Sequence, residues 1–331
     1  MKIVIPMAGY GTRLRPHTWS KPKPLVTVAG KPVLGHVLDM FTALSSIDEA
    51  VFIVGYLGTQ VQDFVSSAYP GLKARYVEQA EMLGQSHAIW RAREGLHGPM
   101  LLVFVDTLIE ADLSGLATEK ADALAWVKAV PDPRRFGVAE AGTDGLVRRL
   151  VEKPKDLSNN LALVGFYYLR QAEGLVAAIS TQMERKQMLH GEYFIADALN
   201  ILLQQGLKMR VRPVEVWHDC GKPEALLETN RYLLEHGRDN SALVAQRPGV
   251  VVVPPVYVDP TAVVSEAVIG PHVSIGAECE VRRSIVQNSI IDSCSQIIDT
   301  ALSASLIGRD ARVIGRYRSL NVGDSSEIGF E

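Results

Sequence analysis

Residues 3–32 read IVIPMAGYGTRLRPHTWSKPKPLVTVAGKP. The apolar run at 3–8 gives way to Gly9 and Gly11, which predicts a buried strand that breaks into a glycine-rich loop. Glycines let the backbone turn tightly and bring its N–H groups against an anionic ligand. The segment therefore predicts a phosphate-binding loop at the end of the first strand.

The residues after this loop distinguish between kinds of phosphate site. A dinucleotide fingerprint needs a glycine where Leu14 stands, and a Walker loop needs a Gly-Lys-Ser/Thr run that the sequence lacks. Four cations follow the loop, interspersed with three prolines: Arg13, Arg15, Lys21 and Lys23, with Pro16, Pro22 and Pro24. Because prolines restrict the backbone, the cations lie in a stiff segment, the basic strap of residues 13–24. Such a strap can neutralise a triphosphate.

The segment GYGTRLRPHTWSKPKPL, residues 9–25, resembles the signature of the sugar-1-phosphate nucleotidyltransferases. The resemblance extends over nearly the whole chain and is greatest to the thymidylyl- and uridylyltransferases of the long form, which end in a hexapeptide β-helix. It implies an enzyme that transfers a nucleotidyl group from dTTP or UTP to glucose-1-phosphate, or a related sugar-1-phosphate, by direct in-line displacement of pyrophosphate. It also implies a nucleotide site made of Ala8, Gly9, Gly11, Thr12 and Arg13, and catalytic roles for Arg13 and Lys23.

The rest of residues 1–236 alternates between strand-like and helix-like segments. Buried strands are predicted at 50–55, 75–78, 99–105 and 161–169, and helices at 33–44, around 61–65 and at 84–96. This alternation predicts an α/β, Rossmann-like catalytic domain whose mixed, mostly parallel sheet carries helices on both faces. Ligands of such sheets bind beyond the carboxyl ends of the strands, which places Gly9, Gln79 and Asp106 along one rim.

Two pairs of residues in this domain match the family pattern for the base and the metal. Gln79 can donate to and accept from a pyrimidine edge while Gly84 lets the backbone approach it, and the resemblance implies that this pair binds thymine or uracil. Asp106 ends an apolar strand, where a buried carboxylate needs a partner such as Mg²⁺. The resemblance implies that Asp106, also a catalytic residue, and Asp219 converge on one Mg²⁺, although Val105 replaces the usual glycine.

Four residues are predicted to bind the sugar-1-phosphate. Glutamate accepts hydrogen bonds from hydroxyls, and lysine supplies a point charge for a phosphate. The resemblance assigns Gly137 and Glu152 to the sugar and Lys153, as a catalytic residue, to its phosphate. Gly165 lies in the middle of the predicted strand 161–169, where a glycine often marks the close approach of a ligand.

Beyond a predicted linker at 237–248, the composition changes to short β-branched residues with small and polar spacers. Aliphatic residues recur every five or six positions: Val252, Val258, Val264, Ile269, Ile275, Val281, Val286, Ile291, Ile297, Leu302, Ile307 and Val313. This period predicts a left-handed parallel β-helix over 249–331. We expect it to mediate assembly into a homo-oligomer or regulation. The alternative of an acyltransferase would need a catalytic histidine, and the sequence of this region offers His272.

The composition of the chain argues against several other classes of protein. The chain has 331 residues, 47% of them hydrophobic, and a net charge near −3, so it suits two domains and lacks the basic bias of nucleic-acid or membrane-surface proteins. No signal peptide or membrane-spanning run is recognisable in the sequence. The cysteines Cys220, Cys279 and Cys294 are too scattered for a disulfide framework. We expect a cytoplasmic protein without nucleic-acid or membrane partners.

Two rival functions remain. A guanylyltransferase acting on mannose-1-phosphate has a very similar basic strap. A non-catalytic regulatory relative can share the architecture, but such proteins tend to lose the strap or the metal carboxylates, and this chain has both. Gln79 and Gly84 favour a pyrimidine without separating dTTP from UTP, because a methyl group contributes only about 1 kcal/mol. The identity of the sugar also stays open.

Overall fold

The computed structural model describes residues 1–41, 44, 47–315 and 325. Contacts divide the chain into two compact units: Met1–Thr27 with Lys31–Thr229, and Val28–Gly30 with Asn230–Glu331. We expected the division after residue 236, whereas the observed one falls within helix α6 (Pro223–Leu233). In these ranges no helix is both long enough and apolar enough to cross a membrane.

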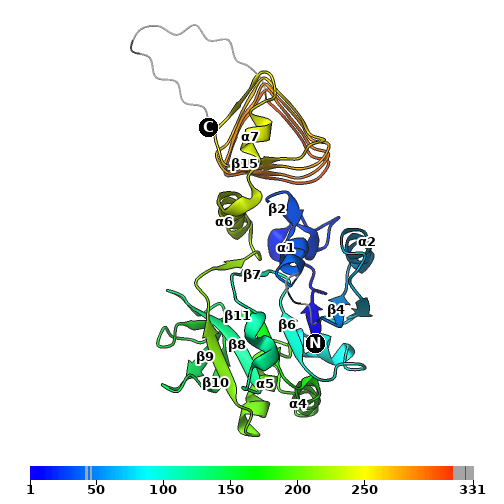
Figure 1. The fold of residues 1–331 in the computed structure, drawn as a ribbon, viewed down its shortest axis with the longest axis vertical. Coiled ribbons are helices and arrows are strands. Elements are labelled where there is room, and N and C mark those ends of the chain that lie inside the picture. Colours follow the sequence, from blue (N-terminus) through cyan, green and yellow to red (C-terminus); the bar gives the residue numbers. More distant parts are fainter. Residues whose placement is uncertain (42–43, 45–46, 316–324, 326–331) are drawn as a thin grey trace. The chain divides into compact units, whose positions relative to one another are not determined.

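The first unit is built around a sheet of nine strands among the described residues (Figure 1). They are β1 (Lys2–Pro6), β4 (Glu49–Val54), β5 (Ala74–Glu78), β6 (Met100–Val103), β8 (Ala123–Ala129), β9 (Gly137–Ala141), β10 (Val147–Glu152), β11 (Leu161–Leu169) and β12 (Met209–Pro213). The main order is β10-β9-β11-β6-β1-β4-β5, and β8 pairs with β11 and β12. Strands β6, β1, β4 and β5 are parallel, whereas β11 is antiparallel to its neighbours. The predicted Rossmann-like domain with a mixed sheet is confirmed.

Helices cover both faces of this sheet because the side chains of each strand alternate between faces. The helices are α1 (Val33–Asp39), α2 (Gly58–Ala68), α3 (Gln85–Arg91), α4 (Ala172–Glu184) and α5 (Ile195–Gln204). One face contributes Val4, Val51 and Leu102 to a core that includes side chains of α3, α4 and α5. On the other face Phe166 stacks with Phe41, just beyond α1, at a ring-centroid distance of 5.9 Å. The helix predicted over 84–96 is shorter and ends at Arg91.

Short elements join the strands near the carboxyl ends of β1 and β6. They are η1 (Thr12–Leu14), η2 (Lys23–Leu25), β2 (Thr27–Val28), β3 (Lys31–Pro32), β7 (Thr107–Ile109), η3 (Ser114–Thr118) and β13 (Trp217–Asp219). Strand β13 pairs antiparallel with β7, so that Asp219 lies opposite Thr107. This pairing brings a late segment of the chain beside the end of β6.

The second unit is a parallel β-helix. After η4 (Leu234–Arg238) and α7 (Ser241–Val244), which falls in the predicted linker, the strands are β14 (Val250–Val252), β15 (Val256–Val258), β16 (Val263–Ser265), β17 (Ala267–Ile269), β18 (Val273–Ile275), β19 (Glu280–Arg282), β20 (Ile285–Gln287), β21 (Ile290–Ile291), β22 (Gln296–Ile298), β23 (Ala301–Ser303), β24 (Leu306–Ile307) and β25 (Arg312–Ile314). Over the described residues they form three parallel sheets of four strands, which Figure 1 shows as the sides of a triangle. The predicted left-handed β-helix is confirmed as far as Ile314, and residues 316–324 and 326–331 lie outside the described part.

The aliphatic residues predicted to stack are register partners on successive coils. The three columns are Val252, Ile269, Val286 and Leu302; Val258, Ile275, Ile291 and Ile307; and Val264, Val281, Ile297 and Val313. They fill the interior of the triangle, because each coil contributes one such residue from each side. His272 Nε2 lies 2.8 Å from Glu235 Oε1, a neighbour that the sequence alone did not reveal.

Candidate active site

The loop after β1 is shaped by its second glycine. Gly11 has φ of 63°, a left-handed conformation that favours glycine. A Cβ at Gly11 would stand 3.0 Å from Lys23 Cβ, and the Gly11 carbonyl accepts a hydrogen bond of 2.9 Å from Thr18 Oγ1. The loop and the basic strap are therefore packed together, and they hold Lys23 beside the glycines.

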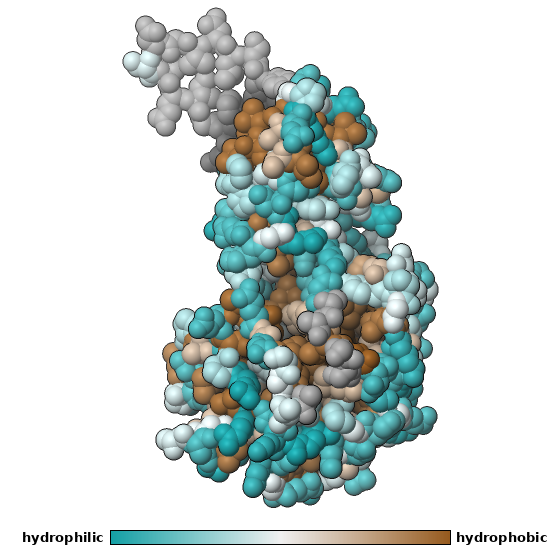
Figure 2. Space-filling view, in the orientation of Figure 1, coloured by the Kyte–Doolittle hydropathy of each residue, from teal (hydrophilic) through white to brown (hydrophobic). Residues whose placement is uncertain are grey.

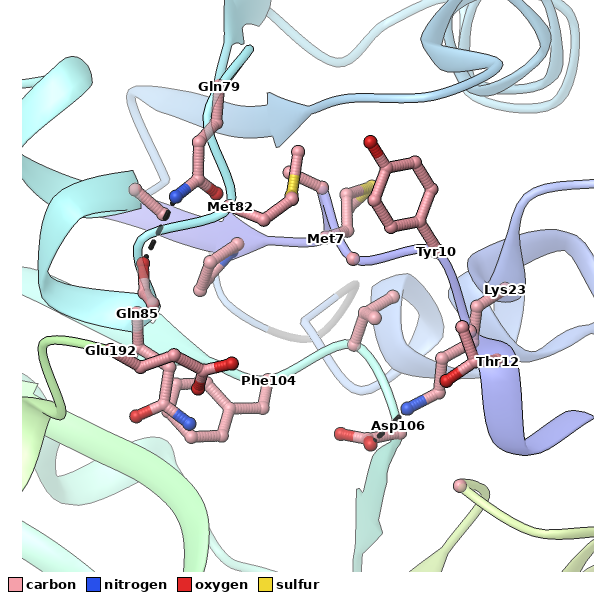
Figure 3. Close-up of a pocket in the computed structure, with 18 of the residues that line it drawn as sticks. Met7, Tyr10, Thr12, Lys23, Gln79, Met82, Gln85, Phe104, Asp106 and Glu192 are labelled. Atoms are coloured by element: carbon pink, nitrogen blue, oxygen red, sulfur yellow. Dashed lines mark hydrogen bonds and ion pairs between the residues drawn. The ribbon is translucent and has the colours of Figure 1, made fainter. Parts of the chain in front are cut away.

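A cavity of about 390 Å³ opens over this loop, which is large enough for a small-molecule ligand. Its walls come from the ends of β1, β5 and β6 and the start of α3 (Figure 3). All nine residues predicted for the nucleotide and its phosphates on this side line it: Ala8, Gly9, Gly11, Thr12, Arg13, Lys23, Gln79, Gly84 and Asp106. The structure thus brings the predicted loop, strap and base-binding pair to one cavity.

Gly84 stands at the start of α3, where space and backbone geometry both require glycine. Its φ is 95°, and a Cβ there would lie 2.7 Å from the backbone N and O of Tyr193. The Tyr193 N–H donates to Leu83 O at 2.8 Å, and its carbonyl accepts from the Ser86 N–H at 3.0 Å. The segment before α5 therefore clamps the start of α3 and fixes the position of the Gly84 backbone in the cavity wall.

Asp106 and Asp219 approach each other, as predicted, because β7 pairs with β13. The Cys220 N–H donates to the Asp106 carbonyl at 2.8 Å, and a Cβ on Gly221 would lie 2.8 Å from Asp219 Oδ1 and 3.5 Å from Asp106 Oδ2. Lys23 Nζ forms an ion pair with Asp106 Oδ2, marked by a dashed line in Figure 3.

Burial and neighbouring charges shift the pKa values of Asp106 and Asp219 in opposite directions. Burial alone would raise the pKa of the Asp106 carboxyl, but the Lys23 ammonium holds it below its ordinary value. Burial and the negative charge of Asp106 together raise the pKa of the Asp219 carboxyl, which Lys23 offsets only in part. The Arg13 guanidinium also lowers both pKa values, more weakly than Lys23, and the two close carboxylates offer oxygen ligands for a cation.

This donor set fits Mg²⁺. The ion prefers oxygen ligands and usually takes only one or two protein carboxylates, with water and substrate phosphates completing its shell. Across the described ranges no group of three or more His, Cys, Asp or Glu side chains could hold a metal. A site of two carboxylates completed by a ligand's phosphates is consistent with both observations.

A second cavity, of about 140 Å³, adjoins the first and shares Arg13, Gln85, Phe104 and Asp106 with it. It is lined by four residues predicted for the sugar or the metal: Gly137, Glu152, Gly165 and Asp219. Gly165 has φ of 79° and interrupts the pairing register of β11 with β8. Burial raises the pKa of Glu152 to about 7; the Lys153 charge opposes this shift and Asp197 and Glu192 add to it.

Lys153 is not among the residues that line either cavity. Its side chain is exposed, and its Nζ lies 4.7 Å from the centre of the Phe194 ring. Lys153 also has φ of 47° and follows directly on β10. The structure therefore places Lys153 beside the second cavity but turned toward Phe194.

Several cavity residues were not assigned to the site from sequence: Met82, Gln85, Phe104, Thr107, Arg135, Glu192 and Trp217. Gln85, Phe104 and Thr107 are next or close to Gly84 and Asp106, so nearness in sequence was a usable signal. Arg135 and Trp217 each lie two positions from a predicted site residue, Gly137 and Asp219, but neither has a side chain whose role the sequence could assign. A lone arginine or tryptophan gives no sign of which cavity it enters.

Comparisons with known proteins agree with this geometry. A family profile described as nucleotidyl transferase matches residues 2–236. The chain is similar to the glucose-1-phosphate thymidylyltransferase of Streptomyces griseus, with 32% identity over 338 residues, 95% of this chain and 93% of that protein. The glucose-1-phosphate thymidylyltransferase of Streptomyces antibioticus is 30% identical over 361 residues and 100% of both chains. Among solved structures, UDP-glucose pyrophosphorylase complexed with UDP-glucose has a TM-score of 0.62 at 22% identity, covering 71% of this chain and 98% of that one, and so shares its fold.

Proposed function

The chain belongs to the nucleotidyl transferase family, and from this premise we propose that it transfers a nucleotidyl group from dTTP or UTP to a sugar-1-phosphate. The products are a nucleoside-diphosphate sugar and pyrophosphate. Glucose-1-phosphate is the proposed acceptor, because both Streptomyces relatives are named for it.

One observation carries the proposal: two adjoining cavities share Arg13 and Asp106. The larger cavity has the glycine loop, the strap lysine and the base-binding pair, and suits a nucleoside triphosphate. The smaller one has Glu152 and two glycines and suits a sugar. The shared residues would then lie where the two phosphates meet, so that binding alone brings the reacting atoms together.

The proposed reaction needs alignment and charge neutralisation. An oxygen of the sugar-1-phosphate attacks the α-phosphorus of the triphosphate, and the bond to the departing pyrophosphate breaks. Because the attacking oxygen already belongs to an anionic phosphate, no general base or covalent intermediate is required. Arg13 and Lys23 would neutralise charge on the triphosphate and the leaving group, while the N–H groups around Gly9 and Gly11 bind phosphate oxygens.

Asp106 and Asp219 would hold Mg²⁺, with Lys23 released from its ion pair with Asp106 to bind a phosphate. When bound there, the ion would neutralise phosphate charge and help to orient the triphosphate. Glu152 would accept hydrogen bonds from sugar hydroxyls. The phosphate role of Lys153 requires its side chain to turn from Phe194 toward the second cavity.

The proposal includes a cytoplasmic homo-oligomer that binds small molecules and neither nucleic acid nor a membrane. A net charge near −3 gives no electrostatic attraction to phosphate backbones or anionic lipids. Three scattered cysteines suit a reducing compartment.

The test is pyrophosphate release with Mg²⁺ over a grid of dTTP, UTP, GTP, CTP and ATP against several sugar-1-phosphates. Strong release with dTTP or UTP and glucose-1-phosphate would support the proposal and name the substrates. Release only with GTP and mannose-1-phosphate would replace it with the guanylyltransferase. If the folded protein releases no pyrophosphate with any pair of substrates, the non-catalytic regulatory relative is favoured.

We predict that Asp106→Asn lowers the turnover number by at least about 100-fold, because the amide cannot supply the negative charge that balances a cation at this position. Asp63→Asn, at an exposed position of α2, is the matched control and should keep full activity. Thermal unfolding of both variants checks that the fold is intact. Turnover near the wild-type value in Asp106→Asn would remove Asp106 from the proposed machinery.

A further inference from the structure

The side-chain amide nitrogen of Gln79 has two hydrogen-bond partners within the protein. Gln79 follows directly on β5, lines the larger cavity and is only 4% exposed. Its Nε2 donates to the Gly84 carbonyl at 3.1 Å, the contact marked in Figure 3, and lies 3.1 Å from Nδ1 of His87. His87, on α3, is 8% exposed and stands behind Gln79, outside the cavity lining.

The Gly84 carbonyl decides which way the amide points. It can only accept hydrogen bonds, so it must face the amide nitrogen; an amide turned around would set two oxygens against each other. With the nitrogen in place, its second hydrogen points to His87 Nδ1. That ring nitrogen must therefore be an unprotonated acceptor, with the ring proton on Nε2.

The surroundings of His87 favour this neutral ring. Burial lowers the pKa of the His87 imidazole, and the nearby Arg91 charge lowers it further. A hydrogen bond with the Glu81 backbone and the charge of Glu81 act in the opposite direction without reversing the shift. The contact with Gln79 requires a neutral ring, and the surroundings of His87 favour that form.

Both hydrogens of the amide are committed to the protein, so the group left for a ligand is Oε1, an acceptor. In Figure 3 the amide oxygen of Gln79 lies on the side of Met82, away from the bonded carbonyl. Thymine, uracil and guanine present a ring N–H beside a carbonyl and can donate to such an oxygen. Cytosine and adenine present a bare ring nitrogen at the matching position, and two acceptors repel each other.

We propose that His87 is a positioning residue that locks the Gln79 amide with its oxygen toward the base and so makes the site reject cytosine and adenine. The inference rests on the proposed function, because it assumes that the base binds at Gln79 and Gly84. Without an acceptor at position 87, the amide loses one of the two contacts that fix it. It can then turn its N–H₂ toward cytosine, and discrimination falls.

The experiment compares wild type with His87→Phe, which removes the acceptor, and His87→Asn, whose side-chain oxygen can stand near the place of Nδ1. Values of kcat/KM are measured with the preferred pyrimidine nucleotide and with CTP. We expect the ratio of the two to fall at least about 10-fold in His87→Phe, through a higher KM for the preferred nucleotide at nearly unchanged kcat, and to recover in His87→Asn. His97→Phe, at an exposed site outside both cavities, should leave the ratio unchanged.

A merely structural role would lower stability in His87→Phe without changing base preference, so a folded His87→Phe with the wild-type ratio overturns the inference. The same holds if His87→Asn discriminates no better than His87→Phe. If His87→Phe fails to fold, nitrogen-15 NMR of wild-type histidine decides: the inference expects a neutral His87 ring with its proton on Nε2, and a proton on Nδ1 overturns it. Wild type that is inactive with every nucleotide refutes the proposed function instead, while the NMR result still tests the ring.

Discussion

Glu152 shows how a single side chain couples the sugar site to stability. It lines the smaller cavity, and burial raises the pKa of its carboxyl group to about 7 from 4.5. Between these two pH values the folded protein binds more protons at Glu152 than the unfolded chain does. The contribution of Glu152 to the free energy of unfolding must therefore fall as the pH rises from about 4.5 through about 7.

We predict that Glu152→Gln removes this loss. The variant should gain about 1–3 kcal/mol relative to wild type when the pH is raised from 5 to 8, because the amide never takes on the buried charge. Urea unfolding followed by tryptophan fluorescence measures this, since Trp19, Trp90, Trp126 and Trp217 all lie in the first unit. Glu140→Gln, an exposed position on β9, is the control. A stability difference that is the same at both pH values would contradict the prediction.

Single residues also show what could be predicted from the sequence and what could not. That Gly11, Gln79, Gly84 and Asp106 would lie together could be predicted, because each is of a residue type with a particular chemical use at the end of a predicted strand or in a long motif, and all four line the larger cavity. His87 could not be found, because a lone histidine on a short helix is ordinarily a core residue. The proposed role of His87 rests on one contact with Gln79, and that contact depends on the orientation of the Gln79 amide group.

At the level of strands and helices, local periods were predictable and long-range pairings were not. The columns of the β-helix follow from an interval of five or six residues, which is visible in any short window. The antiparallel course of β11 beside β6, and the pairing of β7 with β13, join segments far apart in the chain. Only the resemblance led us to expect Asp106 near Asp219, since nothing local to either residue indicates the other.

The corners of the β-helix carry buried serines that the sequence showed only as small spacers. Ser284, Ser289 and Ser295 each precede a strand, and each hydroxyl accepts the N–H of a residue on the next coil: Thr300 at 3.2 Å, Ser305 at 3.0 Å and Ala311 at 3.1 Å. Each hydroxyl also donates to a backbone carbonyl. The serines thus tie successive coils together at positions where the strand ladders are interrupted.

We predict that Ser289→Ala lowers the free energy of unfolding of the β-helix by about 1–3 kcal/mol, because the Ser305 N–H loses its acceptor, the hydroxyl of the fully buried Ser289. Ser303→Ala is the matched control, since the exposed Ser303 hydroxyl accepts from the exposed Gln287 side chain at 3.2 Å, and its removal should cost less than about 0.5 kcal/mol. Urea unfolding followed by far-UV circular dichroism compares the two. Equal effects would mean that the corner hydroxyls contribute no more than a surface contact.

For the molecule as a whole, the outer surface of the β-helix carries exposed apolar side chains. Val251, Val268 and Ile285 are register partners on β14, β17 and β20, and Val251 and Ile285 are 59% and 54% exposed. Figure 2 shows apolar side chains gathered on the surface of this unit. Exposed apolar side chains on one face of a sheet gain from burial against a partner, so this column supports the proposed homo-oligomer.

We predict that light scattering finds wild type larger than one chain, and that Val251→Lys combined with Ile285→Lys lowers the mass toward that of the monomer, because two buried ammonium groups would oppose association. Val263→Lys places the same charge on β16, in a different sheet of the β-helix, at a residue that is 53% exposed, and should leave the mass unchanged. Pyrophosphate release should persist in all three proteins, since none of these residues lines either cavity. A monomeric wild type would refute assembly itself, whereas an equal effect of Val263→Lys would refute the choice of this column as the contact.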